Sequence, residues 1–166
     1  MMKKQQGFTL IELVVVIIIL GILSVVAAPK FINLQKDARS ATLHGLKGSL
    51  EGANALVFSK AAIAGLDTNP GTTVDIGSAN PPAIRYGYLQ SDIGSLQEAM
   101  DIDLAIAGTG IDSEWQYVQL THKVGADTVR IHQKGAPDNG GECYLEYTPA
   151  QTLGGQPLIE VKDKDC

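Results

Sequence analysis

One carboxylate, Glu12, stands inside an otherwise apolar run near the start of the chain. Residues 13 to 28, which follow it, contain no charged side chain. A carboxylate well inside a bilayer costs on the order of 2 to 3 kcal/mol, and less near the membrane edge. An unpaired charge in a dry environment is heavily penalised, so the position of Glu12 needs an explanation.

The two cysteines, Cys143 and Cys166, both lie in the last fifth of the chain. Because an apolar segment precedes them, we expect an exported protein and a disulfide between the two. Such a bond would close a loop worth about 3 to 3.5 kcal/mol in the chain-entropy model. The alternative, two reduced and buried cysteines, suits a cytoplasmic protein instead.

No catalytic set is visible among the titratable residues. The three histidines, His44, His122 and His132, have no motif partner, so packed or solvated side chains are expected. Two acidic groups could offer oxygen ligands to Ca²⁺, but neither has EF-hand spacing, and we expect solvated loops with no metal or cofactor. These groups are Asp101, Asp103, Asp112 and Glu114, and the turn at residues 138–142. Four aromatic residues could stack on a sugar, although sheet packing is the expected role of Trp115, Tyr117, Tyr144 and Tyr147.

The composition fits one folded domain with an appendage. The chain has 166 residues, 45% of them hydrophobic, and a formal net charge of −5. A nucleic-acid partner is not expected, because phosphate binding needs clustered Lys and Arg.

Residues 8 to 28 would span about 31 Å as a helix, close to the hydrocarbon thickness of a bilayer. One interpretation is a secretory signal peptide cut after Ala28, which would leave Pro29 at the new terminus. A second is a simple membrane anchor with its basic end inside. Neither gives Glu12 a partner.

The residues KKQQG followed by FTLIE resemble the class III signal of type IV pilins. The resemblance implies a leader peptide at 1–7 and cleavage by a prepilin peptidase between Gly7 and Phe8. It also implies N-methylation of Phe8 and an assembly role for Glu12, whose partner would be the α-amine of Phe8 in a neighbouring subunit.

A helix is expected from Phe8 to Ala64, roughly 80 Å long, with 8–28 as its membrane or filament-core segment. Its buried face should be marked by apolar residues in 3-4 spacing: Leu43, Leu46, Leu50, Ala53 and Val57. Gly21 and Pro29 match the positions at which pilin helices are flexible, and Pro29 should kink the helix. Close packing against the head is expected for Gly45, Gly48 and Gly52.

Residues 65 to 90 read as a surface loop, and Ser95 with Glu98 predicts a capped helix to about Ala107. Four strand-like runs follow, at 114–121, 127–133, 142–148 and 157–162. We therefore predict an α+β pilin fold, in which the C-terminal half of the long helix packs on a roughly four-stranded antiparallel sheet. The head would span 65–166, with a disulfide-bounded region at 143–166 of the kind that type IV pilins carry.

Residues 28–63 further resemble mannose-sensitive haemagglutinin (MSHA) pilins of Vibrio-like bacteria. This implies the major subunit of a surface pilus used in adhesion and biofilm formation. Its partners would be other copies of itself, the prepilin peptidase and inner-membrane assembly machinery. The subunit would wait in the inner membrane, N-terminus in the cytoplasm, before joining an extracellular filament. A type II secretion pseudopilin shares the N-terminal motif, and a membrane-anchored binding or lectin domain is the other alternative. An anchored or secreted enzyme is not expected, because no nucleophile-base or metal-ligand spacing is visible in the sequence.

Overall fold

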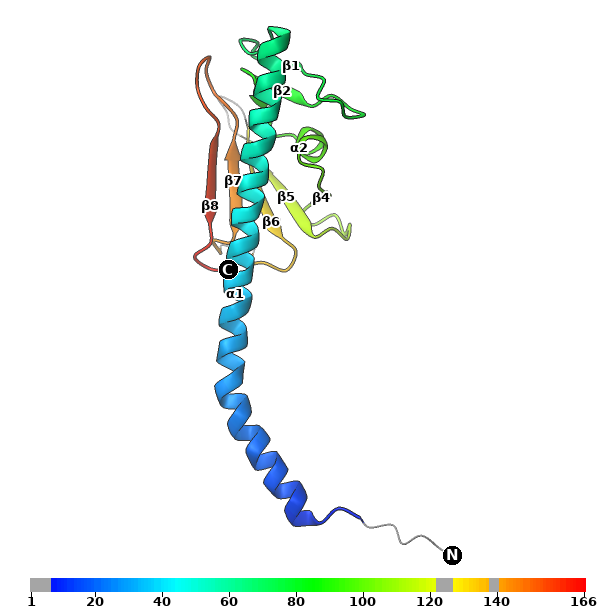
Figure 1. Cartoon of the computed structure of the whole chain (residues 1–166), viewed down its shortest axis with the longest axis vertical. Coiled ribbons are helices and arrows are strands. Elements are labelled where there is room, and N and C mark those ends of the chain that lie inside the picture. The colour runs from blue at the N-terminus through cyan, green and yellow to red at the C-terminus, as the bar shows by residue number, and fades with distance from the viewer. Residues whose placement is uncertain (1–6, 122–126, 138–140) are drawn as a thin grey trace, which may run out of the picture. The chain divides into compact units, whose positions relative to one another are not determined.

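The computed structural model describes residues 7–121, 127–137 and 141–166, which form two compact units divided after Asp37 (Figure 1). Each unit is described by itself. The first contains the apolar part of helix α1, and the second contains the rest of α1 with all the strands described below.

Helix α1 spans Leu10–Ala64, close to the predicted 8–64. The helix continues through Gly21 and Pro29 without interruption. Its end has a clear cause. Gly65 adopts a positive φ of 69°, and the amides of Gly65 and Leu66 donate to the carbonyls of Ala62 and Ala61. This is a Schellman motif, in which glycine supplies the left-handed residue that stops the helix.

In the second unit, α1 buries one face against the sheet, as the 3-4 spacing predicts. The residues of this face are all less than 8% exposed: Leu43, Leu46, Leu50, Ala53, Val57 and Ala61. The expectation for Gly45, Gly48 and Gly52 is wrong, because a Cβ at any of them would meet nothing within 4 Å. These glycines lie on the opposite, exposed face of the helix. The spacing of the glycines alone does not show which face of α1 they occupy. The position of the buried apolar residues does show it.

Among the described residues, the main sheet has five strands in the order β4-β5-β6-β7-β8. The predicted four strands are present as its antiparallel part, and a fifth, β4, is added in parallel at the edge beside β5. Three residues are too few to show a strand pattern in a sequence. Figure 1 shows β7 and β8 alongside α1. The strands are β4 (Leu104–Ile106), β5 (Trp115–Leu120), β6 (Thr128–Gln133), β7 (Tyr144–Thr148) and β8 (Leu158–Lys162).

The predicted loop at 65–90 is wrong in part, because it holds a small antiparallel sheet of β1 (Thr72–Thr73), β2 (Ala83–Arg85) and β3 (Tyr88–Leu89). Tyr86 and Gly87 form the two-residue turn between β2 and β3, both with positive φ. Gly87 has a second constraint, since a Cβ there would lie 2.8 Å from Phe58 Cδ2. The hairpin therefore packs closely on α1.

The second helix, α2, spans Ile93–Met100 and is shorter than predicted. Its N-cap is Asp92, whose carboxylate accepts from the Ser95 amide at 2.9 Å. The predicted capping box is wrong, because Ser95 Oγ instead accepts from the Ala83 amide, at 2.8 Å. Glu98 accepts from Asn80 at 2.6 Å. Ser95 therefore joins α2 to the small sheet and Glu98 joins it to the loop before β2, which local spacing could not reveal.

A buried polar contact joins α1 to both sheets. Asn54, 4% exposed, accepts from the Leu89 amide at 3.1 Å and from the Tyr147 hydroxyl at 3.3 Å. Tyr147 also donates to the Leu89 carbonyl at 2.6 Å. Burial raises the pKa of Tyr147 well above its usual range, so the hydroxyl stays neutral. These bonds satisfy groups that would otherwise be buried without partners.

Replacing Asn54 tests this contact. Asn54→Ala leaves the Leu89 amide buried without an acceptor, and we expect the free energy of unfolding to fall by about 1 to 3 kcal/mol. Chemical denaturation of the full chain in detergent micelles measures the change. Ser59→Ala is the matched control on the exposed face of α1 and should change the value by less than about 0.5 kcal/mol. Equal losses for the two variants would contradict the role of Asn54.

Candidate functional site

The start of α1 carries a capping box. Thr9 donates to Glu12 Oε2 from its amide at 2.8 Å and from its hydroxyl at 2.7 Å, and the Glu12 amide donates back to the Thr9 hydroxyl at 3.3 Å. Within a single chain, Glu12 therefore already has hydrogen-bond donors. Sequence reasoning missed Thr9, although a threonine three residues before a glutamate is a recognisable capping signal.

The apolar part of α1 has large side chains that the described residues leave exposed. Exposed fractions are 56% for Ile18, 64% for Ile22 and 58% for Leu23. By length and composition, α1 can cross a membrane. A Cβ at Gly21 would meet nothing within 4 Å, and Pro29 lies inside the helix. Flexibility at these two positions stays a prediction.

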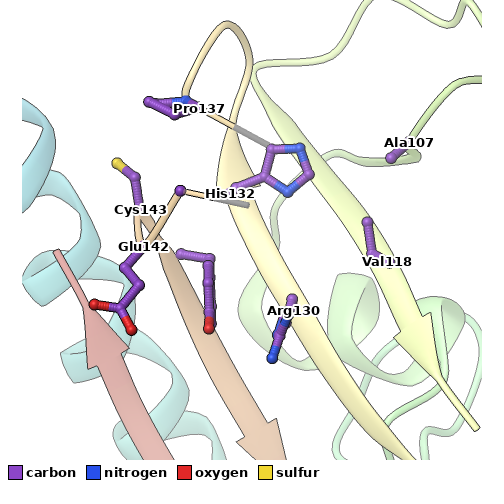
Figure 2. A pocket seen from close by; sticks show the side chains of 9 residues that line it. Ala107, Val118, Arg130, His132, Pro137, Glu142 and Cys143 are labelled. Carbon is purple, nitrogen blue, oxygen red and sulfur yellow. The ribbon is translucent and has the colours of Figure 1, made fainter. Parts of the chain in front are cut away.

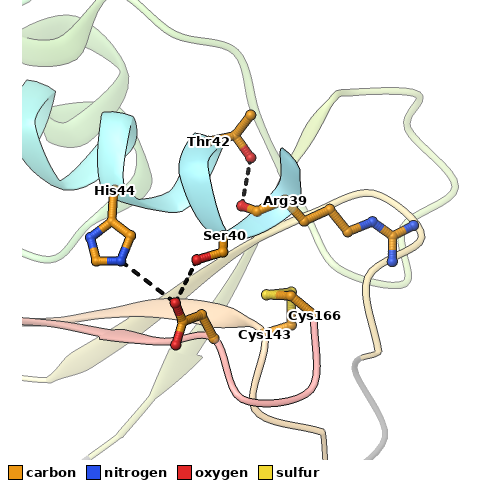
Figure 3. A network of polar contacts seen from close by, with 7 residues as sticks. Arg39, Ser40, Thr42, His44, Cys143 and Cys166 are labelled. Carbon is orange, nitrogen blue, oxygen red and sulfur yellow. Dashed lines mark hydrogen bonds and ion pairs between the residues drawn. A yellow bond between two sulfur atoms is a disulfide. The ribbon is translucent and has the colours of Figure 1, made fainter. Parts of the chain in front are cut away.

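The C-terminal segment is held by a disulfide and a pair of hydrogen bonds. Cys143 and Cys166 are joined, as expected, and Cys143 is 1% exposed (Figure 3). Beside the bridge, Asp165 accepts from the Glu142 amide through its carboxylate and donates to the Glu142 carbonyl through its own amide, both at 3.0 Å. These contacts attach the end of the chain to the start of β7.

The same segment is also attached to α1. Asp163 Oδ2 accepts from the Ser40 hydroxyl at 2.5 Å and lies 3.5 Å from His44 Nε2 (Figure 3). The Ser40 hydrogen bond is the main reason that the pKa of Asp163 lies below its ordinary value of 3.8, and His44 adds to the effect. His44 is therefore part of a structural contact, in agreement with the absence of a motif partner in the sequence.

A cavity of about 360 Å³ lies on the face of the main sheet that carries Arg130 and His132 of β6 (Figure 2). Two of its polar side chains, Arg130 and His132, already have partners within the chain. Arg130 donates to Glu146 at 2.8 Å and lies 4.4 Å from the centre of the Tyr144 ring, while His132 lies 3.2 Å from Gln116 Oε1. In this cavity these side chains form a paired structural network rather than a set of free catalytic groups.

The other sequence candidates are dispersed or structural. In the part of the chain that the structure describes, no group of three His, Cys, Asp or Glu residues could hold a metal ion. Asp112 forms an ion pair with Lys134, which lowers its pKa. Tyr117 and Tyr147 are buried in the core, as expected for strand aromatics. His122 and residues 138–140 lie outside the described residues.

Comparison with known proteins shows what this chain is similar to. Residues 2–28 match the family model described as the prokaryotic N-terminal methylation motif. This range contains Gly7, Phe8 and Glu12, together with the exposed apolar part of α1. The chain therefore carries the N-methylation motif of type IV pilins on an N-terminal apolar helix, followed by an α+β head of pilin-like architecture.

Two curated relatives are type IV pilins. The chain is 27% identical over 163 residues to the type IV major pilin protein PilA of Myxococcus xanthus, covering 94% of this chain and 67% of the relative. It is 38% identical over 58 residues to the type IV narrow pilus major component PilA5 of Thermus thermophilus, covering 35% of this chain and 50% of that relative. No solved structure gives a significant match.

The chain is thus homologous to type IV major pilins, which are structural proteins rather than enzymes. A pilin of this kind is anchored in the membrane by its apolar helix before assembly into an extracellular pilus.

The disulfide should contribute measurably to stability. Its cysteines are separated by 23 residues, so its loss should lower the free energy of unfolding by about 3 to 3.5 kcal/mol in the chain-entropy model. Denaturation of the Cys143→Ser/Cys166→Ser variant in detergent, compared with the parent, gives this difference. A parent that is no more stable than the variant would show that the bridge does not constrain the unfolded chain.

The contact between Asp163 and Ser40 predicts a pH dependence. Because the pKa of Asp163 is lower in the folded state, its stabilisation is present above the ordinary value of 3.8 and is lost as pH falls through the folded pKa. The stability difference between the parent and Asp163→Asn should therefore be present at pH 6 and disappear in acid. Thermal denaturation between pH 2 and 6 measures it, with exposed Asp75→Asn as the control. A difference that is unchanged across this range would contradict the assignment.

Proposed function

We propose that this chain is the major structural subunit of a type IV pilus of the MSHA type, which polymerises into surface filaments for adhesion and biofilm formation. The observation that carries the proposal is the N-terminal methylation motif at residues 2–28, which includes the part of α1 whose apolar side chains are left exposed by the described residues. Such a surface needs lipid before assembly and other subunits afterwards.

In this proposal, a prepilin peptidase cuts between Gly7 and Phe8 and the new amine of Phe8 is methylated. Glu12 then meets the positively charged amine of Phe8 in a neighbouring subunit. Both hydrogen bonds that Thr9 donates go to Oε2, so the second carboxylate oxygen is left for this amine. Opposite charges attract strongly in a dry environment. The ion pair between Glu12 and the neighbouring amine would therefore fix the register in which the subunits dock.

The subunit would be taken from the inner membrane by the pilus assembly machinery and added to a helical polymer. Heterologous contacts that do not close generate such open filaments. The disulfide between Cys143 and Cys166 favours a pilus over a type II secretion pseudopilin, since the resemblance associates a terminal disulfide with pilins.

Mass spectrometry of the N-terminal peptide from sheared surface material tests the proposal. We expect a chain that begins at N-methylated Phe8. A chain that begins at Pro29 would mean secretion after signal-peptidase cleavage and would overturn the filament proposal.

The Glu12→Gln variant separates processing from docking in the same measurement. Cleavage and methylation should persist in the membrane fraction, because Gly7 and Phe8 are unchanged, while the sheared fraction should lose the subunit. Glu12→Asp, which keeps the charge, is the matched control and should retain more filaments. Normal filaments from Glu12→Gln would remove the docking role of this carboxylate.

A further inference from the structure

A groove of about 610 Å³ runs along one flank of α1 in the second unit. Its walls are α1, the β2–β3 hairpin and the start of β8. Phe58 and Tyr88 stack with ring centres 4.8 Å apart, and Leu158, on the opposite wall, is 56% exposed. Apolar groups left in water at a concave site favour a partner that covers them.

The groove continues onto an outer face of α1 that carries no charge. We define this outer face by seven residues in unbroken 4-3 spacing, all of them exposed: Ala41, Gly45, Gly48, Gly52, Ala55, Ser59 and Ala62. The solvent-facing side of a helix normally carries charged and polar residues. Small residues instead allow a second helix to approach closely. Ala55 and Ser59 belong both to the outer face and to the groove.

The chain itself supplies a matching apolar surface. Phe31, Ile32 and Leu34 of α1 are 71%, 68% and 64% exposed in the first unit. They follow the apolar run at 8–28, which is already as long as the hydrocarbon layer, so lipid does not cover them in a full span. These three residues therefore need a protein partner.

The groove and the turn from Phe31 to Leu34 also match in length and in charge. From Glu51 to Ser59 the helix side of the groove extends about 12 Å, enough for the single turn from Phe31 to Leu34. Lys30 immediately precedes that turn, and Glu51 lines the groove with a side chain that stays 55% exposed beside Lys47, whose Nζ lies 3.8 Å from Glu51 Oε1. Opposite charges at the edge of an apolar contact help to fix its register.

We propose that the groove and outer face of one copy receive the Phe31–Leu34 turn of α1 from a second copy. The contact is heterologous, because each copy offers a groove to one neighbour and a turn to another. The inference rests on the proposed pilus function and specifies the surface through which the head of one subunit meets the helix of another.

Cysteine cross-linking in sheared filaments tests the contact. Each chain carries Leu34→Cys and Ala55→Cys, both at exposed positions, and the native cysteines are already joined to each other. After oxidation, dissociation and non-reducing electrophoresis, we expect a ladder of dimers, trimers and longer chains. The single variants should stay monomeric, since one cysteine per chain cannot link a head-to-tail contact.

The matched control pairs Leu34→Cys with Ile111→Cys, which is 64% exposed and lies outside the groove. The inference would be overturned if this control gave a ladder and the groove pair did not. It would also be overturned if neither pair gave a ladder. If the parent chain itself forms no filaments and begins at Pro29, the proposed function fails instead, so the two failures are distinct.

Maleimide labelling of single variants gives a second measurement. It remains possible even where the double cysteine variant assembles poorly into filaments. Ala55→Cys should label readily in the detergent-solubilised subunit and be protected in filaments. Ile111→Cys should label equally in both. Equal labelling of Ala55→Cys in the two states would contradict a covered groove.

Discussion

The apolar surface of α1 is the constraint on which the rest of the structure depends. One half of this 55-residue helix packs its Leu43–Ala61 stripe into a core, while the large side chains before Pro29 are left exposed by the residues that the structure describes. Hydrophobic surface of this extent is stable only in lipid or against other protein. The same helix must therefore serve two environments, which is what a membrane-anchored subunit of a filament requires.

The attachments of the head to α1 are spread along the helix. Near its start in the second unit, Ser40 holds Asp163 and so the end of the chain. Further along, Asn54 joins α1 to the small sheet and to Tyr147 of the main sheet. The disulfide then links the two ends of the β7–β8 region. A head attached in this way leaves the outer face of α1 unoccupied.

Glu12 shows how a single chain and a proposed assembly can satisfy the same carboxylate. In the subunit, the Thr9 amide and hydroxyl supply two hydrogen bonds to one carboxylate oxygen, which lessens the penalty of burying a charge in an apolar segment. Hydrogen bonds lower this penalty but supply no opposite charge. The proposed amine of a neighbouring Phe8 would add that charge, so the two roles are compatible rather than competing.

The sequence by itself determined the long helix, its buried stripe, the four longer strands and the disulfide pair, because these depend on local periodicity or on there being two cysteines. Tertiary structure decided the rest. The strands at 72–73, 83–85 and 88–89 are too short for a pattern, and β4 exists through its pairing with β5. Ser95 and Glu98 do not form the predicted capping box but bind Ala83 of the small sheet and Asn80 of the loop before β2. Gly45, Gly48 and Gly52 are the sharpest case: their identity is plain in the sequence, yet only packing of the opposite face against the sheet shows that they point outward. Local spacing specifies which residues share a helix face, and long-range contacts decide which face is buried.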